Sequence, residues 1–150
     1  MKTMICVDHT GYCSFNYEAF QAVNKRCELG EEVSIATVNM TNQFIQLKTA
    51  IYNIVEMHSF SNGVLIASTI RNAKRVLSCS NTSKKVLYLY DIDWMNSIMS
   101  YSENYDVLTN KNLLVICRSE SHQEVIEKSF GIKAVIIEKF DLEKIWNLLG

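Results

Sequence analysis

The chain has 150 residues, of which 48% are hydrophobic and 21% are charged, a balance that excludes a disordered chain and is typical of a globular domain. The formal net charge of −1 excludes an overall positive field that would draw the protein to nucleic acid or anionic lipid. This balance still allows a local basic patch, so the sequence leaves nucleic-acid binding open.

Short apolar runs and helical repeats alternate in the first part of the chain. Residues 3–7 form a β-rich run that ends at Asp8, which predicts a strand. Apolar residues then recur at helical spacing over residues 15–27, and Gly30 is a natural helix stop. Residues 32–38 again have the composition of a strand.

A longer helix is predicted over residues 41–58. Thr41 or Asn42 is the expected N-cap. The apolar stripe of this helix would consist of Phe44, Leu47, Ile51, Ile54 and Val55.

The rest of the chain continues the alternation. Further strands are predicted over residues 63–69, 84–91, 112–119 and 133–140. Helical segments are predicted over residues 71–79, 94–100, 120–130 and 141–149. Gly131 closes the third of these helices, and Asp141 is the N-cap of the last.

This order of elements predicts an α/β fold. The six strands are mostly unbroken apolar runs, as expected when helices cover both faces of a parallel sheet. With right-handed crossovers, the result is a doubly wound, Rossmann-like, mostly parallel sheet. We expect residues 1–150 to form one such domain, because the sequence contains no linker and no repeat.

Cysteine usage and hydropathy predict the compartment. The five cysteines are scattered and odd in number, which is typical of reduced, buried thiols in the cytoplasm. No apolar run approaches the roughly 20 residues of a membrane-spanning helix. The first residues also turn polar too soon for a signal peptide. We therefore expect a cytoplasmic protein without membrane attachment.

Polar residues follow the predicted strands, and in a parallel sheet these loops share one edge. The candidate site residues in the loops are Asp8, His9, Thr10, Gly11, Tyr12, Ser68, Thr69, Asp91, Asp93, Arg118 and Ser119. The first loop holds one glycine and lacks the G-x-G-x-x-G fingerprint of dinucleotide binding. The chain also lacks a P-loop motif and a G-x-S-x-G elbow, so no cofactor is predicted.

Each acidic candidate allows two interpretations. Asp8 either caps the following helix or binds a ligand, and His9 is either a general base or a solvated surface group. Asp91 and Asp93 have the spacing to share a face of a strand and could bind a metal or act as an acid/base pair. Their alternative role is to cap the next short helix, and Trp94 is expected to pack over the side of the sheet.

The basic candidates are similarly ambiguous. Arg118 either holds a phosphate or carboxylate or forms a salt bridge with Glu120 or Glu124. Ser119 or Ser121 also fits the N-cap of the following helix. The one local basic cluster, best explained as a solvated face, consists of Lys74, Arg75, Lys84 and Lys85.

Three pieces of the chain together suggest a family. The strand over residues 63–69 ends in small hydroxyl residues, the aromatic–acidic stretch YDIDW occupies residues 90–94, and an arginine–serine helix start with Glu120 and His122 occupies residues 118–122. In their order, these pieces resemble the N-terminal Rossmann-like half of the B-type (GT-B) glycosyltransferases of tailed bacteriophages. The resemblance spans most of the chain.

The resemblance implies a domain that binds an acceptor or a nucleotide-like ligand at the strand ends, with Asp8 or His9 as the catalytic base. Complete members have a second domain that binds most of the sugar nucleotide. We therefore expect no sugar transfer by this chain alone: either a separate chain supplies the other half, or the chain is a stand-alone domain that has lost transfer activity. If the protein is phage-encoded, it would act in the host cytoplasm.

Two other functions stay open. The first is a non-enzymatic domain that binds a host protein, a phage protein or a second copy of itself, with Tyr101 and Tyr105 in the contact surface. The second is a flavodoxin-like or response-regulator-like module. For a receiver, Asp8 and Asp91 have suitable positions, but the acidic pair and the late lysine of receivers are not evident.

Overall fold

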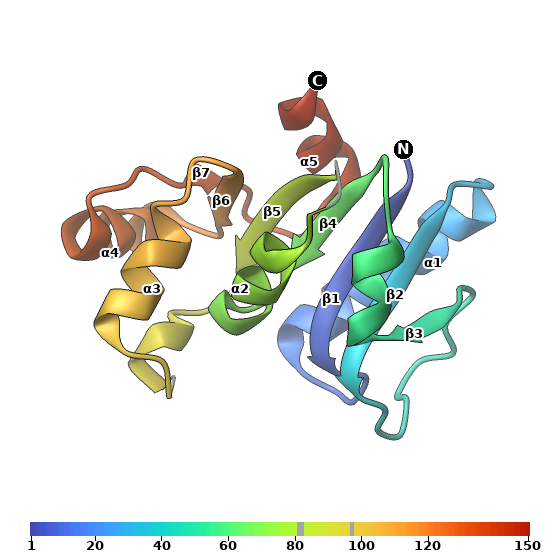
Figure 1. Cartoon of the computed structure of the whole chain (residues 1–150). Helices are drawn as coiled ribbons and strands as arrows, with labels where there is room; N and C mark the ends of the chain where they lie inside the picture. Colours follow the sequence, from blue (N-terminus) through green and yellow to red (C-terminus); the bar gives the residue numbers. More distant parts are fainter. Residues whose placement is uncertain (81–82, 97) are drawn as a thin grey trace.

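A parallel sheet forms the centre of the computed structural model, which describes residues 1–80, 83–96 and 98–150. Its seven strands within those ranges are β1 (Thr3–His9), β2 (Val33–Asn39), β3 (Ile51–Asn53), β4 (Val64–Ala67), β5 (Lys84–Leu89), β6 (Leu113–Cys117) and β7 (Val135–Ile136). Their spatial order is β3-β2-β1-β4-β5-β6-β7, and all neighbours are parallel (Figure 1). The predicted α/β, Rossmann-like class is confirmed, with one strand more than the predicted six.

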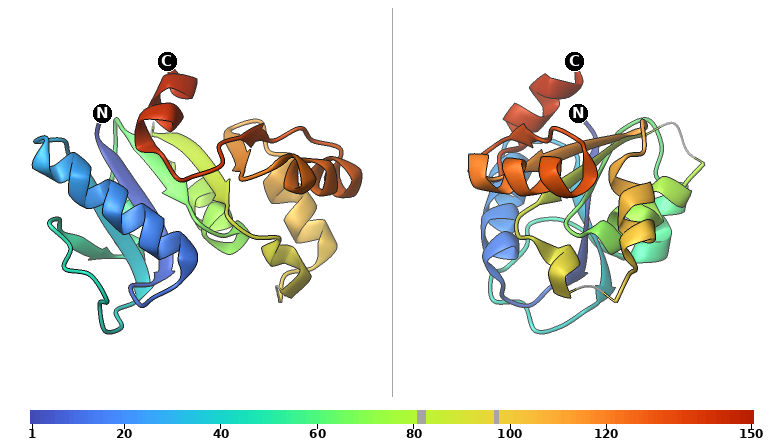
Figure 2. Two further views of the ribbon diagram at one scale, coloured as in Figure 1. Left: turned by 180° about the vertical axis from the view of Figure 1, so that it is seen from behind. Right: turned by 90° about the vertical axis from the view of Figure 1, so that its left-hand side faces the viewer.

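Helices cover both faces of the sheet (Figure 2). They are α1 (Ser14–Glu28), η1 (Ile54–Ser59), α2 (Ile70–Ser78), η2 (Asp93–Asn96), α3 (Tyr101–Leu108), α4 (Glu120–Phe130) and α5 (Leu142–Leu149). The apolar side chains of α1 and α5 pack on one face, and those of η1, α2, α3 and α4 pack on the other. Right-handed crossovers require this division, because the chain adds strands in one direction from β1 and in the opposite direction from β4.

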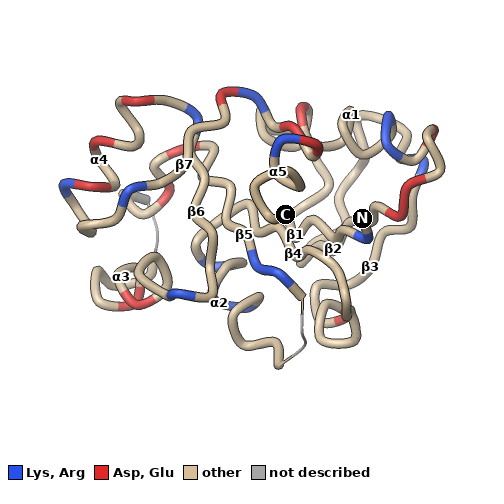
Figure 3. The backbone as a smooth tube through the Cα atoms, turned by 90° about the horizontal axis from the view of Figure 1, so that it is seen from above, with Lys and Arg blue, Asp and Glu red and all other residues tan. Residues whose placement is uncertain are grey.

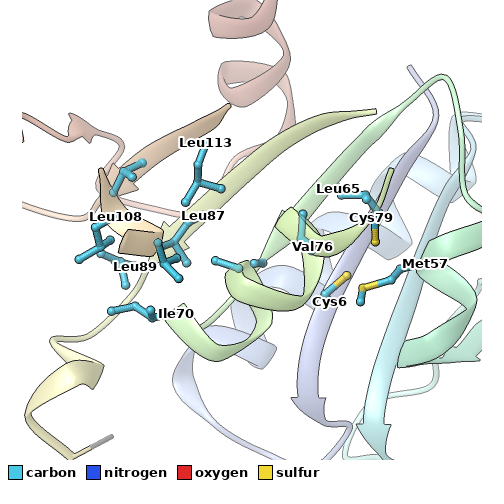
Figure 4. Close-up of a cluster of buried hydrophobic side chains, with 14 of the residues drawn as sticks. Cys6, Met57, Leu65, Ile70, Val76, Cys79, Leu87, Leu89, Leu108 and Leu113 are labelled. Atoms are coloured by element: carbon cyan, nitrogen blue, oxygen red, sulfur yellow. The ribbon is translucent and has the colours of Figure 1, made fainter. Parts of the chain in front are cut away.

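Successive residues of the central strands point to opposite faces of the sheet. On β5, Leu87 and Leu89 enter the core cluster beneath α2 (Figure 4), whereas Val86 and Tyr88 enter the cluster beneath α1 and α5. The predicted burial from both faces is confirmed for residues 3–7, 64–67 and 86–89. On β6, Leu114 is only half-buried.

The helix predicted over residues 41–58 is wrong. Residues 40–50 form an irregular loop, which is followed by the short strand β3 and the 3-10 helix η1. Phe44 and Ile51 pack with the cluster beneath α1, but Ile54 belongs to the cluster on the opposite face. The segment thus passes around the edge of the sheet, and its apolar side chains pack on both faces. The apolar stripe of a single helix could pack on one face only.

Two other boundaries differ from the prediction. The strand predicted over residues 133–140 shortens to β7. The amide of Ile137 still donates to the carbonyl of Cys117 on β6 at 2.9 Å, but its carbonyl accepts from the hydroxyl of Tyr88 at 2.7 Å. The helix α3 was not predicted, although Ser100 and Glu103 form a capping box at its start. Of the predicted helical turn over residues 94–100, Ser97 lies outside the described residues.

Several predicted helix ends are confirmed. Asp141 accepts hydrogen bonds from the amides of Glu143 and Lys144 and caps α5. Gly131 ends α4 with a φ of 71°, a left-handed conformation that glycine adopts without steric cost. These ends depend on neighbouring residues only, which is why the local sequence predicts them.

Acidic and basic residues are interspersed along the backbone (Figure 3). This distribution agrees with the net charge of −1. Within the described ranges, the helices are all too short or too polar to cross a lipid bilayer.

Candidate functional site

The order of the strands reverses between β1 and β4, and a pocket of about 140 Å³ lies at the ends of these strands and of β5. In open α/β sheets this switch point is the usual place for a ligand, because the loops on either side diverge. We call it the strand-end pocket. Its lining residues are Asp8, His9, Cys13, Phe15, Asn16, Ser68, Thr69, Tyr90, Asp91 and Asp93.

Six of the predicted site residues meet in this pocket. They come from the end of β1 and from the segments that follow β4 and β5, and they comprise Asp8, His9, Ser68, Thr69, Asp91 and Asp93. Asp91 thus lies at the same edge of the sheet as Asp8, as predicted from the parallel arrangement. The other five candidates, which include Arg118 and Thr10, lie outside the lining.

Asp93 has the most unusual environment among these carboxylates. Its Oδ2 accepts a hydrogen bond from the backbone amide of Ile70 at 3.0 Å, so it binds the first turn of α2, 23 residues earlier in the chain. Its Oδ1 is buried, and no hydrogen-bond partner for it exists among the described residues. Burial is the main cause that raises the pKa of Asp93, the negative charges of Asp8 and Asp91 add to it, and the Ile70 amide opposes it.

Asp8 faces the pocket rather than capping the following helix. The N-cap of α1 is Cys13, whose thiol accepts a weak hydrogen bond from the amide of Asn16 at 3.4 Å. Asp8 Oδ1 instead accepts from the side-chain amide of the fully buried Asn72 at 3.0 Å. The oxygen of that amide in turn accepts from Arg75 at 2.7 Å, which fixes its orientation.

The sequence predictions missed several of these residues. Cys13, Asn16 and Tyr90 line the pocket, and Asn72 supports it from below. Asn16 donates to the carbonyls of His9 and Gly11, each at 2.8 Å, and so holds the first loop in shape. Its place in the first turn of a helix, just after a polar loop, was the available signal.

Thr10, Gly11 and Tyr12 stabilise the first loop from outside the pocket. The hydroxyl of Thr10 donates to the carbonyl of Thr41 at 2.8 Å and accepts from its amide at 3.0 Å. A Cβ at Gly11 would lie 2.9 Å from Thr41 Oγ1, so a larger residue at this close approach would require the Thr41 side chain to shift. The ring of Tyr12 packs edge-to-face on Phe44, with centroids 5.3 Å apart.

Arg118 and Ser119 line a separate hollow with His122 and Glu138. The guanidinium of Arg118 lies over the ring of Tyr90 at 3.8 Å, and its Nε donates to the Tyr90 carbonyl at 2.6 Å. Its ion pair is with Asp91, at 3.4 Å, and not with either of the two glutamates considered from the sequence. Ser119 is the N-cap of α4.

The remaining sequence candidates have structural contacts. Trp94 packs edge-to-face on Phe130, with ring centroids 5.2 Å apart, as its packing interpretation predicted. The basic cluster makes internal contacts through every member: Lys74 to Glu103, Arg75 to Asn72, Lys84 to the carbonyls of Leu149 and Gly150, and Lys85 to the carbonyl of Cys79. The cationic groups of this cluster are therefore bonded within the protein and do not form a free basic patch.

The strand-end pocket is rich in hydrogen-bond acceptors. Three carboxylates line it, and Ser68 and Thr69 add hydroxyl groups. Within the described ranges, no group of three or more His, Cys, Asp or Glu side chains has an arrangement that could hold a metal ion. The chemistry that these groups offer is the acceptance of hydrogen bonds and protons.

No family model matches the chain, and no curated protein or solved structure matches it significantly.

Proposed function

We propose that the chain is a glycosyltransferase-like binding domain whose strand-end pocket takes a hydroxyl group of a small sugar-like acceptor. The observation that carries this proposal is Asp93 Oδ1, a buried carboxylate oxygen without a hydrogen-bond partner among the described residues. Leaving such an atom unpaired costs free energy, and a ligand hydroxyl that donates to it would remove that cost. The resemblance of residues 63–69, 90–94 and 118–122 to the acceptor-binding half of GT-B enzymes supports the same ligand class.

The charge of the pocket favours a neutral ligand over a phosphate. Asp8, Asp91 and Asp93 would repel an anion in a half-enclosed site. Arg118, the nearby guanidinium, is already engaged with Tyr90 and Asp91. The volume of about 140 Å³ lies below the roughly 300–1,000 Å³ of pockets for drug-sized ligands, so one sugar ring or less fits, and a complete nucleotide does not.

In this proposal the Asp93 carboxylate accepts a hydrogen bond from the ligand hydroxyl, and Asp8 lines the same pocket. Burial raises the pKa of Asp93, which makes its ionised form a better proton acceptor than an exposed aspartate. His9 lines the same pocket and keeps the role of an alternative base. Binding is the activity proposed for the chain by itself. The free state of all five cysteines, each within the described ranges, supports a cytoplasmic setting.

The experiment is a chemical-shift titration of the isotope-labelled chain with neutral monosaccharides. We expect amides of residues 8–9, 68–69 and 91–93 to shift. Asp93→Asn keeps an oxygen that can accept from the Ile70 amide but removes the charge, and it should weaken binding roughly tenfold. Asp106→Asn removes an exposed carboxylate on α3 and is the matched control. Unchanged binding by the Asp93 variant would contradict the proposal.

A second candidate function is protein interaction, by a host or phage partner or by a second copy. A specific observation favours it: four apolar residues between 95 and 105 are strongly exposed, namely Met95 (75%), Ile98 (86%), Tyr101 (63%) and Tyr105 (44%). Such clustering marks contact surfaces more often than isolated exposed residues do. If no monosaccharide shifts the strand-end amides while the fold stays native, this second function becomes the better explanation.

A further inference from the structure

Another hollow, of about 450 Å³, lies between α1 and the segment that leads into α5. Both walls are on the same face of the sheet (Figure 2, left). We call it the α1–α5 groove. Its α1 wall presents Tyr17, Gln21 and Lys25, and its other wall presents Lys139. It lies outside the strand-end pocket, from which the contact between Tyr90 and Glu18 separates it.

Each acidic group of this groove already has at least one oxygen bonded inside the protein. Glu18 accepts from the Tyr90 hydroxyl at 3.1 Å and from the Phe140 amide at 3.0 Å. Asp141 accepts from the first-turn amides of α5. Glu143 is paired with Arg26 at 2.7 Å, and this bond is the main cause that raises the pKa of Arg26.

The donors of the groove are unused. Among the described residues, the ammonium groups of Lys25 and Lys139 have no ion-pair or hydrogen-bond partner, and neither does the side-chain amide of Gln21 or the hydroxyl of Tyr17. The six charged groups that line the groove cancel formally. Its remaining hydrogen-bonding capacity is nevertheless mainly that of a donor site, since four donor groups are unused, against one carboxylate oxygen each on Asp141 and Glu143.

From this pattern we propose that the α1–α5 groove binds a phosphate ester of a small ring-bearing molecule. Two ammonium groups on opposite walls suit a dianion with several acceptor oxygens better than a carboxylate with one charge. The volume exceeds that of a phosphate group alone and falls in the range of organic ligands. The exposed ring of Tyr17, backed by a nearly parallel Phe44 at 6.5 Å, offers a flat surface for the organic part.

Phenyl phosphate is the probe that combines both features. A chemical-shift titration should move amides of residues 17–25 and 139–141 and leave residues 68–69 and 91–93 of the strand-end pocket in place. Lys25→Gln and Lys139→Gln should each weaken binding roughly tenfold, because each removes one charge-assisted hydrogen bond. Both side chains are exposed, so neither change should disturb folding.

Lys111→Gln is the matched control, because it removes an exposed lysine from the loop before β6, away from the groove. An equal loss of affinity in this control would show that phenyl phosphate responds to the overall positive charge of the protein and not to the groove, and it would overturn the proposal. Benzoate and inorganic phosphate are the comparison ligands. The proposal requires both to bind more weakly than phenyl phosphate, so equal or tighter binding of either, or no binding of phenyl phosphate, would overturn it.

Discussion

The strand-end pocket and the α1–α5 groove are neighbours, yet the fold leaves them with opposite hydrogen-bonding capacity. In the pocket, Asp93 keeps a buried oxygen without a donor among the described residues. In the groove, Glu18 has both oxygens occupied, whereas Lys25 and Lys139 are free in the same described part of the chain. The comparison teaches that the kind of ligand follows from the groups that the fold has not used, and not from a count of charges.

The cause of this difference is local geometry. The carboxylates of the pocket lie at or just after the ends of buried strands, where the amides of Ile70 and Asn72 donate to one oxygen each of Asp93 and Asp8 and leave Asp93 Oδ1 buried without a donor among the described residues. The lysines of the groove stand on the outer surface of α1 and on a loop, where the acidic groups around them serve as a helix cap or as an anchor for the chain. The unpaired donors or acceptors of each site therefore depend on the helix, strand or loop that carries the side chains.

The largest effect is expected from the core that both sites share. Leu87 on β5 is fully buried, and Leu87→Ala should lower the free energy of unfolding by roughly 2–5 kcal/mol, the usual loss for a buried leucine. A denaturant titration measures it. Because both sites rest on this sheet, each should still bind its probe while the variant stays folded. A loss below about 1 kcal/mol would contradict a central position for this strand.

A smaller effect should separate the two sites. The Tyr88 hydroxyl donates to the carbonyl of Ile137, two residues before Lys139. Tyr88→Phe leaves that buried carbonyl without its donor and should cost about 1–3 kcal/mol in the free energy of unfolding. The change loosens the wall of the groove, so phenyl phosphate should bind more weakly, whereas monosaccharide binding should stay at the wild-type level. Equal weakening of both ligands would break the distinction between the sites.

The smallest effect is a pair of opposite pH dependences. Asp93 has an unpaired oxygen and a pKa raised above the ordinary 3.8, so its protonated form is favoured in the fold and stability falls as pH rises through the raised pKa. Glu103 is paired with Lys74 and Ser100, which lower its pKa from 4.5 to about 2, so stability falls as pH drops from 4.5 towards 2.

Thermal midpoints of the wild type, Asp93→Asn and Glu103→Gln between about pH 2 and pH 7 measure both dependences. The first variant should lose the decline on raising the pH, and the second should lose the decline on lowering it. The Glu103 effect should weaken in high salt, because this carboxylate is exposed. A shift of the same sign in both variants would contradict the contrast between an unpaired and a paired carboxylate.

Local sequence alone predicted much of this protein. Unbroken apolar runs and helical spacing gave the α/β order, and Asp141, Ser119 and Gly131 marked helix ends correctly, because strand burial and helix capping depend on residues close in the chain. The principle that parallel strands end at one edge of the sheet correctly grouped six of the eleven predicted site residues.

Only the tertiary structure decided the features that join distant segments. The apolar residues between 41 and 58 fit a helical stripe, but the sheet edge divides them between two faces, and strand pairing with β2 prevails over the helical period. The environment of Asp93 depends on the amide of Ile70, which lies 23 residues earlier in the chain. Arg118 is not free to bind a ligand, because its guanidinium stacks on Tyr90. The sequence could not predict these contacts for a physical reason. Residue spacing indicates which side chains can share a face of one helix or strand. The hydrogen-bonding groups that stay unpaired at a site depend on every segment that packs there.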